Sequence, residues 1–338
     1  MQQEFDSNKQ MDRLPAGRTI SIPVSGTMLT MPCFFPSISC VKTNLGILEY
    51  LRTIKAVGHP LFLISAYDIY NAGSQKSAII RKALKESVED GRAVILDSGN
   101  YESYWVKDAD WTRAKYWSCL SSCYYGFAFH FDKRLQKIKR GTVQSITNEI
   151  ERSVLGDQRK ARIGTVLPIV HAPNEILPEI AVQIAVRLNP VMIAVPEREL
   201  GDGLIERSLT VARVRKLLNQ LGRYYPIHLL GTGNPLSILI YVMCGADSFD
   251  GLEWCQTTVN FDNALLYHFH QREFFGEQSR YDSLKNIPYA QATLAHNLEF
   301  YRIWMQRIQN SLPNITHMAR SYLPKEFFET LKNRLNTV

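Results

Sequence analysis

Seven short apolar runs constrain the fold of this chain more than any other feature. Each has the length of a β-strand, and they cover residues 61–65, 93–96, 127–131, 165–170, 191–195, 227–230 and 246–249. Most are separated by segments of helical length and pattern, for example 76–90, 176–188 and 204–221. Near-continuous apolar runs are typical of parallel strands buried on both faces. The pattern predicts the α/β class and a (β/α)8 barrel similar to triosephosphate isomerase, with an open, doubly wound sheet as the alternative.

The start of the chain predicts a β-hairpin that precedes this barrel. Residues 20–33 form two extended stretches around the turn-forming pair Ser25-Gly26. No eighth strand is evident, because the stretch 255–275 is aromatic and irregular, and we expect helices after it. With 338 residues, 45% of them hydrophobic, and no shift in composition, we expect one domain over residues 1–338.

Charge and cysteine content limit the partners and the cellular compartment expected for the protein. The chain has 39 Lys and Arg against 32 Asp and Glu, a net charge of +7. This excess is compatible with a polyanionic partner without requiring one. The six cysteines lack the spacing of a disulfide framework, so we expect reduced thiols and a cytoplasmic protein. We find neither a signal peptide nor an apolar run of 18 residues, and we expect no membrane-spanning segment.

The barrel hypothesis places active-site groups directly after the strands, at the carboxyl-terminal face. Acids and aromatic residues follow the apolar runs at many of these points, and buried carboxylates are costly without a function. The candidates are Tyr67, Asp68, residues 97–102, Asp132, His171, Pro196, Glu197, residues 231–233 and Asp250.

Asp97 and Asp250 are the strongest candidates for chemistry. Both stand in turn-forming sequence at the end of an apolar run. Paired carboxylates suit reactions at a sugar carbon, where one attacks the anomeric centre and the other transfers a proton. An isolated Asp is more often a surface turn residue, so the surrounding sequence has to support the chemical role.

Five motifs, taken in order, resemble those of the tRNA-guanine transglycosylases and their DNA-modifying relatives. Residues 26–36 look like the opening hairpin of that family, residues 96–101 like its Asp-Ser-Gly-Gly-aromatic motif, and residues 169–171 like its Val-Gln-Gly strand end. Residues 228–235 followed by 245–250 are the closest match, and residues 290–298 resemble its late His-Asn motif. The resemblance covers the chain from about residue 18 to 311. Each motif alone is weak, whereas the ordered set is fairly specific.

The resemblance implies an exchange of bases in a polynucleotide. Asp250 would attack C1′ of a guanosine and expel guanine, and Asp97 would act as general acid and base for the two bases. Tyr101 and Leu230 would enclose the flipped purine, and Asp132 would accept hydrogen bonds from its N1–H and exocyclic amine. The resemblance adds three backbone contacts to the base, at Ala194, Val195 and Gly231.

Three departures from the family pattern bear on substrate and metal. The family's zinc site uses three cysteines and the late histidine, but the chain has His296 with no cysteine between Gln256 and His296, so we expect no metal or other cofactor. Residues 251–258 lack the Arg of the loop that holds tRNA in the family, which favours DNA. His171 replaces a Gln that reads the base, so it either contacts the incoming heterocycle or is an inert core imidazole. Asn100 replaces a Gly.

Two further stretches have open interpretations. Lys133, Arg134, Lys137 and Arg140 follow Asp132, and a basic group at Arg159, Lys160 and Arg162 comes shortly after; they form either a solvated helix face or a phosphate-binding surface. An aromatic-rich stretch precedes them, and core packing is favoured over base stacking for its members, Trp105, Trp111, Tyr116, Trp117, Tyr124 and Tyr125.

The sequence therefore predicts a guanine transglycosylase that exchanges guanine for a 7-deazaguanine base in a polynucleotide, with DNA favoured over tRNA. Accessory proteins that open the duplex would be compatible with this function. The alternatives are a tRNA-guanine transglycosylase, a glycosidase that releases the base to water, a non-catalytic nucleic-acid-binding subunit, and an unrelated sugar-phosphate barrel enzyme. The presence of both Asp97 and Asp250 argues against a non-catalytic subunit, because such a subunit has no need of either.

Overall fold

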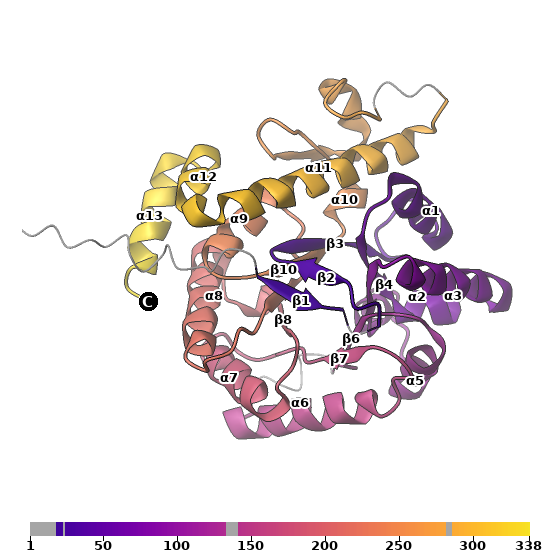
Figure 1. The fold of residues 1–338 in the computed structure, drawn as a ribbon, viewed down its shortest axis with the longest axis horizontal. Helices are drawn as coiled ribbons and strands as arrows, with labels where there is room; N and C mark the ends of the chain where they lie inside the picture. Colours follow the sequence, from indigo (N-terminus) through magenta and orange to yellow (C-terminus); the bar gives the residue numbers. More distant parts are fainter. Residues whose placement is uncertain (1–17, 23, 133–140, 282–285) are drawn as a thin grey trace, which may run out of the picture.

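The computed structural model describes residues 18–22, 24–132, 141–281 and 286–338. Eight parallel strands in chain order form its centre, and helices surround them (Figure 1). The strands are β3 (Cys33–Ile38), β4 (Leu61–Ser65), β5 (Ala93–Asp97), β6 (Phe127–Phe129), β7 (Thr165–Leu167), β8 (Ile193–Pro196), β9 (Ile227–Leu230) and β10 (Ser248–Gly251).

The sheet closes on itself at two places. Strand β10 pairs in parallel with β3, so that Asp250 lies opposite Phe35. Beyond the end of β7, a parallel bridge joins Ile169 to Ala194 of β8. There the Val170 amide donates to the Ala194 carbonyl at 2.8 Å, and the Ala194 amide donates to the Pro168 carbonyl at 2.9 Å. The predicted α/β class and the (β/α)8 barrel are confirmed.

The outer layer consists of helices that follow the strands. They are α1 (Ile47–Val57), α2 (Ala66–Asn71), α3 (Ser74–Glu89), α4 (Asn100–Trp105), α5 (Arg113–Ser122), α6 (Val143–Gln158), α7 (Leu177–Leu188), α8 (Gly203–Asn219), α9 (Pro235–Met243) and α10 (Glu253–Gln256), with the 3-10 helix η3 (Glu197–Glu199). The three helices predicted at 76–90, 176–188 and 204–221 are α3, α7 and α8. Alternate strand residues pack outward against this layer or inward into the barrel, as a side-chain period of two requires.

The eighth strand lies at the start of the barrel, not after Asp250. Residues 33–38 form β3, whereas the expected hairpin over 20–33 consists only of β1 (Thr19–Ser21) and β2 (Met28–Thr30). The prediction missed β3 because its run is interrupted by Pro36, and proline usually marks an edge or a break in a strand. The irregular stretch after Cys255 instead forms an antiparallel pair outside the barrel, β11 (Thr257–Val259) and β12 (Leu266–His268), followed by the 3-10 helix η4 (Phe269–Phe275).

The hairpin fills the amino-terminal end of the barrel. Ile22 and Leu29 are buried with the inward residues Phe35, Ile95 and Phe127 in one apolar cluster. A Cβ atom on Gly126, just before β6, would come within 2.5 Å of the Ile22 side chain, so this position requires glycine. The amino-terminal end is therefore closed by packing, which leaves the carboxyl-terminal end for a site.

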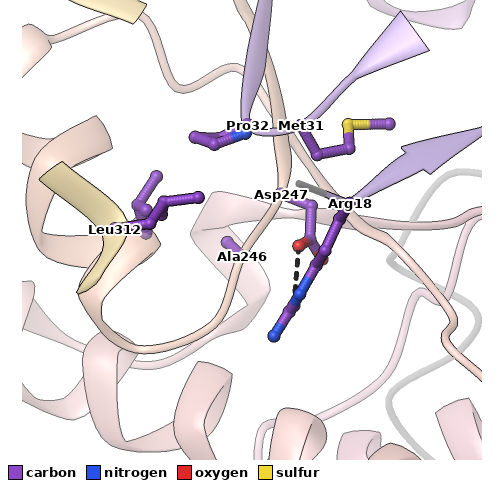
Figure 2. A pocket seen from close by; sticks show the side chains of 7 residues that line it. Arg18, Met31, Pro32, Ala246, Asp247 and Leu312 are labelled. Atoms are coloured by element: carbon purple, nitrogen blue, oxygen red, sulfur yellow. Dashed lines mark hydrogen bonds and ion pairs between the residues drawn. The ribbon is translucent and has the colours of Figure 1, made fainter. Parts of the chain in front are cut away.

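Behind the hairpin, a buried ion pair joins Arg18 to Asp247, just before β10 (Figure 2). Helix α11 (Tyr289–Ser311) crosses the molecule beside α9, α10 and α1 (Figure 1). The chain continues through the 3-10 helix η5 (Leu312–Asn314) to α12 (Ile315–Tyr322) and α13 (Lys325–Leu335), which confirms the expected C-terminal helices.

Candidate active site

The inward side chains change from apolar to polar at the carboxyl-terminal ends of the strands. On β5 the inward residue Ile95 is followed, two positions later, by Asp97, and on β3 Phe35 is followed by Ser37. The same alternation places Ser65, His171 and Asp250 at this end of the barrel. The predicted acids therefore meet at one rim, as the barrel hypothesis requires.

Asp250 is held in one orientation by three neighbours. The Ser37 hydroxyl donates to Oδ2 at 2.7 Å, and the Gly231 amide donates to Oδ1 at 3.1 Å. The His228 Nε2 atom lies 3.2 Å from Oδ1. Asp250 is buried, with 7% of the residue exposed, and it lies near the carboxyl-terminal end of β10. A fixed carboxylate at this position is suited to act as a nucleophile.

Both ring nitrogens of His228 have polar neighbours. Its Nδ1 atom lies 2.7 Å from the Ser248 Oγ atom, which in turn lies 3.6 Å from the Cys33 thiol. If the thiol donates to Ser248 and Ser248 donates to Nδ1, then Nε2 carries the proton and donates to Asp250. No role for His228 was predicted from the sequence. The signal was present, because His228 and the inward Leu230 are two positions apart on one strand.

Asp97 has a different environment from Asp250. The Gly99 amide donates to its Oδ2 atom at 2.9 Å, and Gly99 adopts a positive φ of 81° to reach this position. Burial raises the pKa of Asp97 well above its usual value, and the charges of Glu102, Asp132 and Asp250 raise it further. The raised pKa favours the protonated form of Asp97, which is the form required of a general acid.

Two more buried acids stand behind Asp97. The Ser65 hydroxyl donates to the Glu102 carboxylate at 2.8 Å, and the Cys40 amide donates to Asp68 at 2.9 Å. Burial, followed by the charge of Asp68, raises the pKa of Glu102 to about 7. Burial also raises the pKa of Asp68 to about 6. Glu102 was within the predicted rim segment, but its coupling to Asp97 was not foreseen.

Glu253 adds a carboxylate on the other side of Asp250. Its side chain lies against two glycines, and a Cβ atom on Gly233 or Gly251 would come within 1.9 or 2.3 Å of its Oε2 atom. Burial raises the pKa of Glu253 to about 7, and the charge of Asp250 contributes to the increase. Gly233 and Gly251 thus make room for the Glu253 side chain.

Asp132 is almost saturated with hydrogen bonds. Its Oδ1 atom accepts from the Ser98 hydroxyl and from the Asn100 amide, both at 2.7 Å, and its Oδ2 atom lies 2.9 Å from the His171 Nε2 atom. Burial opposes the charged form, but these three hydrogen bonds outweigh it and hold the pKa of Asp132 well below its usual value. Since a carboxylate oxygen has two lone pairs, Oδ2 retains room for one further donor.

His171 lies between two acids. Its Nδ1 atom is 3.8 Å from a Glu199 oxygen, and both atoms are buried without a hydrogen-bond partner at standard distance. Burial lowers the pKa of His171, but the hydrogen bond to Asp132 and the charges of Asp132 and Glu199 outweigh it and raise the pKa to about 9. The imidazole is therefore charged at neutral pH and neutralises Asp132. Glu199 was not among the predicted residues, because η3 brings it to the site only in the folded chain.

The remaining predicted base-contacting residues occupy different parts of the rim. Tyr101, on α4, is 39% exposed, and Leu230 packs against the inward cluster. The Gly231 amide is directed to Asp250. Both backbone groups of Ala194 pair across the barrel closure, and Val195 pairs with Leu229 of β9. Strand pairing therefore uses part of the backbone capacity expected to bind the base.

The members of the basic and aromatic stretches lie in different parts of the structure. Lys133, Arg134, Lys137 and Arg140 lie outside the described residues. The group at 159–162 precedes β7 and so belongs to the amino-terminal side of the barrel, away from Asp250. Of the aromatic stretch, Trp111, Tyr116 and Tyr125 are core residues, whereas Trp105 is 45% exposed.

The late His-Asn motif is structural. The Asn297 side chain donates to the Trp254 and Thr257 carbonyls at 2.8 and 2.7 Å and accepts from the Val259 amide, while His296 Nε2 lies 2.8 Å from the Val259 carbonyl. These bonds fasten the β11–β12 pair to α11. Among the residues that the structure describes, no group of three or more His, Cys, Asp or Glu is arranged to hold a metal ion.

Comparisons with known proteins do not assign this chain. No protein-family model matches it, and a search of curated proteins returned no significant match. None of the helices in the described ranges has the length and apolar character needed to cross a membrane. The function must therefore be inferred from the site itself and from the motif resemblance.

Proposed function

We propose that the protein is a guanine transglycosylase that exchanges guanine for a 7-deazaguanine base in a polynucleotide, with DNA as the favoured substrate. The observation that carries the proposal is the contrast between two acids at one rim. Asp250 is fixed by neighbouring polar groups, whereas burial and the charge of Glu102 raise the pKa of Asp97. Two carboxylates in such different environments are suited to nucleophilic and acid–base roles.

The proposed reaction gives each of the two acids one role. An Asp250 oxygen attacks C1′ of the target guanosine, and the bond from C1′ to N9 of guanine breaks with its electron pair going to the base. Asp97 gives its proton to the departing guanine. Asp97 then takes the N9 proton of the incoming base, whose N9 attacks C1′ and releases the Asp250 carboxylate.

The recognition of guanine involves Asp132. One acceptor position on its Oδ2 atom remains for the N1–H or the exocyclic amine of guanine, and a second requires Asn100 or Ser98 to give up its bond. Adenine has no N1–H, so an acceptor at this position favours guanine. Tyr101 and Leu230 are the candidates for the two faces of the base.

We infer DNA as the substrate and the cytoplasm as the location from features of the sequence. Residues 251–258 contain no arginine, unlike the tRNA-holding loop of the transglycosylases that the chain resembles. All six cysteines are free, and we infer a cytoplasmic location from this pattern.

The test is incorporation of labelled guanine into single-stranded DNA, double-stranded DNA and tRNA. We expect exchange into DNA, best at unpaired guanines because flipping them costs less, and a denaturation-resistant adduct between protein and oligonucleotide. Asp250→Asn should abolish both, since an amide is a poor nucleophile. Asp262→Asn, a change at an exposed loop acid, is the matched control.

Each outcome bears on a different part of the proposal. Near wild-type exchange by Asp250→Asn would remove Asp250 as the nucleophile. Exchange into tRNA alone would preserve the mechanism and change the substrate. Release of guanine without entry of a new base would make the protein a glycosidase. Nucleoside mass spectrometry of DNA and RNA from cells with and without the protein identifies the incoming base.

A further inference from the structure

Helix α4 exposes an unusual amount of aromatic surface beside the candidate site. Four of the thirteen exposed large hydrophobic side chains in the described part of the chain lie within residues 101–106. Tyr104 is 53% exposed, Trp105 45% and Tyr101 39%. In contrast, Trp111 of the same stretch is buried, and its indole donates to the Ser98 carbonyl at 3.1 Å. The exposed aromatic rings are therefore a local feature of α4.

These rings lead outward from the rim. Tyr101 and Trp105 are four residues apart, so they share one face of the helix, with ring centroids 6.2 Å apart. The Tyr104 ring meets Trp105 edge-on at 5.6 Å. At the inner end of this row, burial raises the pKa of Tyr101, and the charges of Glu102 and Glu253 raise it further. Its neighbour Asn100 bonds directly to Asp132.

Cationic groups accompany the aromatic row. The Lys42 ammonium lies 3.5 Å from the centroid of Trp105, and the Lys42 carbonyl accepts a bond from the Gln256 side chain at 3.0 Å. This bond positions the loop after β3 against α10. Lys107, directly after α4, is exposed. Aromatic faces next to lysines offer both stacking for a base and attraction for the adjoining phosphate.

We propose that Tyr104, Trp105 and Lys42 form a stacking site for the unpaired nucleotide next to the exchanged guanosine. The site rests on the proposed function, since it takes a polynucleotide as substrate. Continuity with Tyr101 and Asp132 places it one step outside the base pocket. The base stacks on the face of the Trp105 ring, which the Tyr104 ring borders edge-on, and the Lys42 ammonium moves from the ring to the phosphate.

The central experiment is a double-mutant cycle between protein and oligonucleotide. Binding is measured for single-stranded DNA and RNA oligonucleotides with one guanine, whose 5′ or 3′ neighbour is either a normal nucleotide or an abasic residue. For the wild-type protein, one of the two abasic replacements should weaken binding about 5- to 150-fold, the range for loss of one stacked base. For Trp105→Ala, binding to the intact oligonucleotide should weaken by a similar factor, and the abasic replacement should then have little further effect.

Two variants distinguish the effect of base stacking from the effect of losing exposed apolar area. Trp105→Phe retains an aromatic face and should recover most of the affinity. Val106→Ala removes exposed apolar area from the same helix without removing a ring and should bind as the wild type does. A base stacked on Trp105 should quench its fluorescence. Trp254 and Trp304 are fully buried and should not respond, so the quenching should be much smaller in Trp105→Phe.

The outcomes distinguish this proposal from the proposed function. If the wild-type protein exchanges guanine but Trp105→Ala binds equally well, with the same response to abasic neighbours, the stacking site is wrong and the transglycosylase proposal stands. If the wild-type protein neither binds nor exchanges guanine in any oligonucleotide, both proposals fail together. Equal weakening by Val106→Ala would show that the patch acts through apolar area alone and would also overturn the stacking site.

Discussion

Asp247 and Asp250 are three residues apart at strand β10, and both are almost fully buried, yet their surroundings differ completely. Asp247, at the amino-terminal end, forms ion pairs with Arg18 and Arg215. It also accepts bonds from the Tyr224 hydroxyl at 2.6 Å and the Ile227 amide at 2.8 Å. Asp250, at the carboxyl-terminal end, has only Ser37, Gly231 and His228 as bonded partners in the described chain.

The same contrast extends from the two residues to the two ends of the barrel. At the amino-terminal end, Arg18, just before the hairpin, and Arg215 of α8 balance Asp247. Figure 2 shows the ion pair of Arg18 with Asp247. At the carboxyl-terminal end, burial and mutual repulsion raise the pKa values of Asp97, Asp68, Glu102 and Glu253. A buried acid whose charge is balanced by cations has a structural explanation. A cluster of buried acids whose charges are poorly balanced indicates a functional site.

The largest expected effect on stability comes from Asp247. Asp247→Asn leaves two buried arginines without their counter-charge, and we expect the free energy of unfolding to fall by about 3–5 kcal/mol. Asp250→Asn should change it by less than about 1 kcal/mol, because no cation loses its partner. Urea unfolding of both variants at pH 7 measures the difference. Equal losses in the two variants would remove the distinction between the ends of the barrel.

Glu102→Gln tests the acidic end through its pH dependence. The pKa of Glu102 is raised in the folded state to about 7, so its contribution to stability is present below about pH 4.5 and is lost as the pH rises through 7. The variant should match the wild type near pH 4.5 and be more stable by up to about 3 kcal/mol at pH 8. Glu89→Gln, at an exposed position, should show no such trend. A pH-independent difference between Glu102→Gln and the wild type would contradict the assignment.

The same variant should also alter the reaction. Without the charge of Glu102, the pKa of Asp97 should fall, and the alkaline limb of the exchange rate should move to lower pH. Measuring the pH profile of guanine exchange separates this effect from a loss of folded protein, since the variant is the more stable form at high pH.

The sequence was sufficient for the barrel because the relevant signal is local. Each outer strand residue is apolar wherever a helix covers it, and seven of the eight strands show this as a run. The strand that was missed contains Pro36, which pairs with Gly251 at the point where the barrel closes. Closure depends on residues far apart in the chain, so no local pattern revealed it.

The candidate site was predictable in the same local sense. Asp97, Asp132, His171 and Asp250 follow strands and meet at one rim. Their partners were harder to find, because Ser37, Glu199 and His228 reach the acids from other strands or turns. Asp247 illustrates the limit most clearly. In the sequence it resembles Asp250, and only Arg18 and Arg215, both distant in the chain, identify it as structural.

His171→Gln examines the one compensated acid at the carboxyl-terminal rim. The pKa of His171 is raised to about 9, so its contribution is complete below about pH 6.5 and is lost as the pH rises through 9. We expect the variant to be less stable by about 2 kcal/mol near pH 6.5, since the Gln amide restores part of the bond to Asp132. The two proteins should converge above pH 9.5. A constant difference across this range would show that His171 is neutral.

The smallest expected effect concerns the buried groups on α11. His296 lies 2.8 Å from the Val259 carbonyl and packs 4.6 Å from the Phe261 ring, so it serves the attachment of β11 rather than a metal. His296→Gln should lower the free energy of unfolding by about 1 kcal/mol, the usual value of one hydrogen bond. Guanine exchange should be unaffected.

Removal of metal provides the decisive measurement for this region. We expect the purified protein to contain no stoichiometric zinc, and a chelator should leave its melting temperature unchanged. Structural zinc contributes its binding free energy to folding, so a bound ion would show itself as a large fall in melting temperature on chelation. One zinc per chain by elemental analysis would make Cys255, His268, His270 and His296 the groups to test. In that event the buried polar groups of α11 would bind a metal ion in addition to packing against β11.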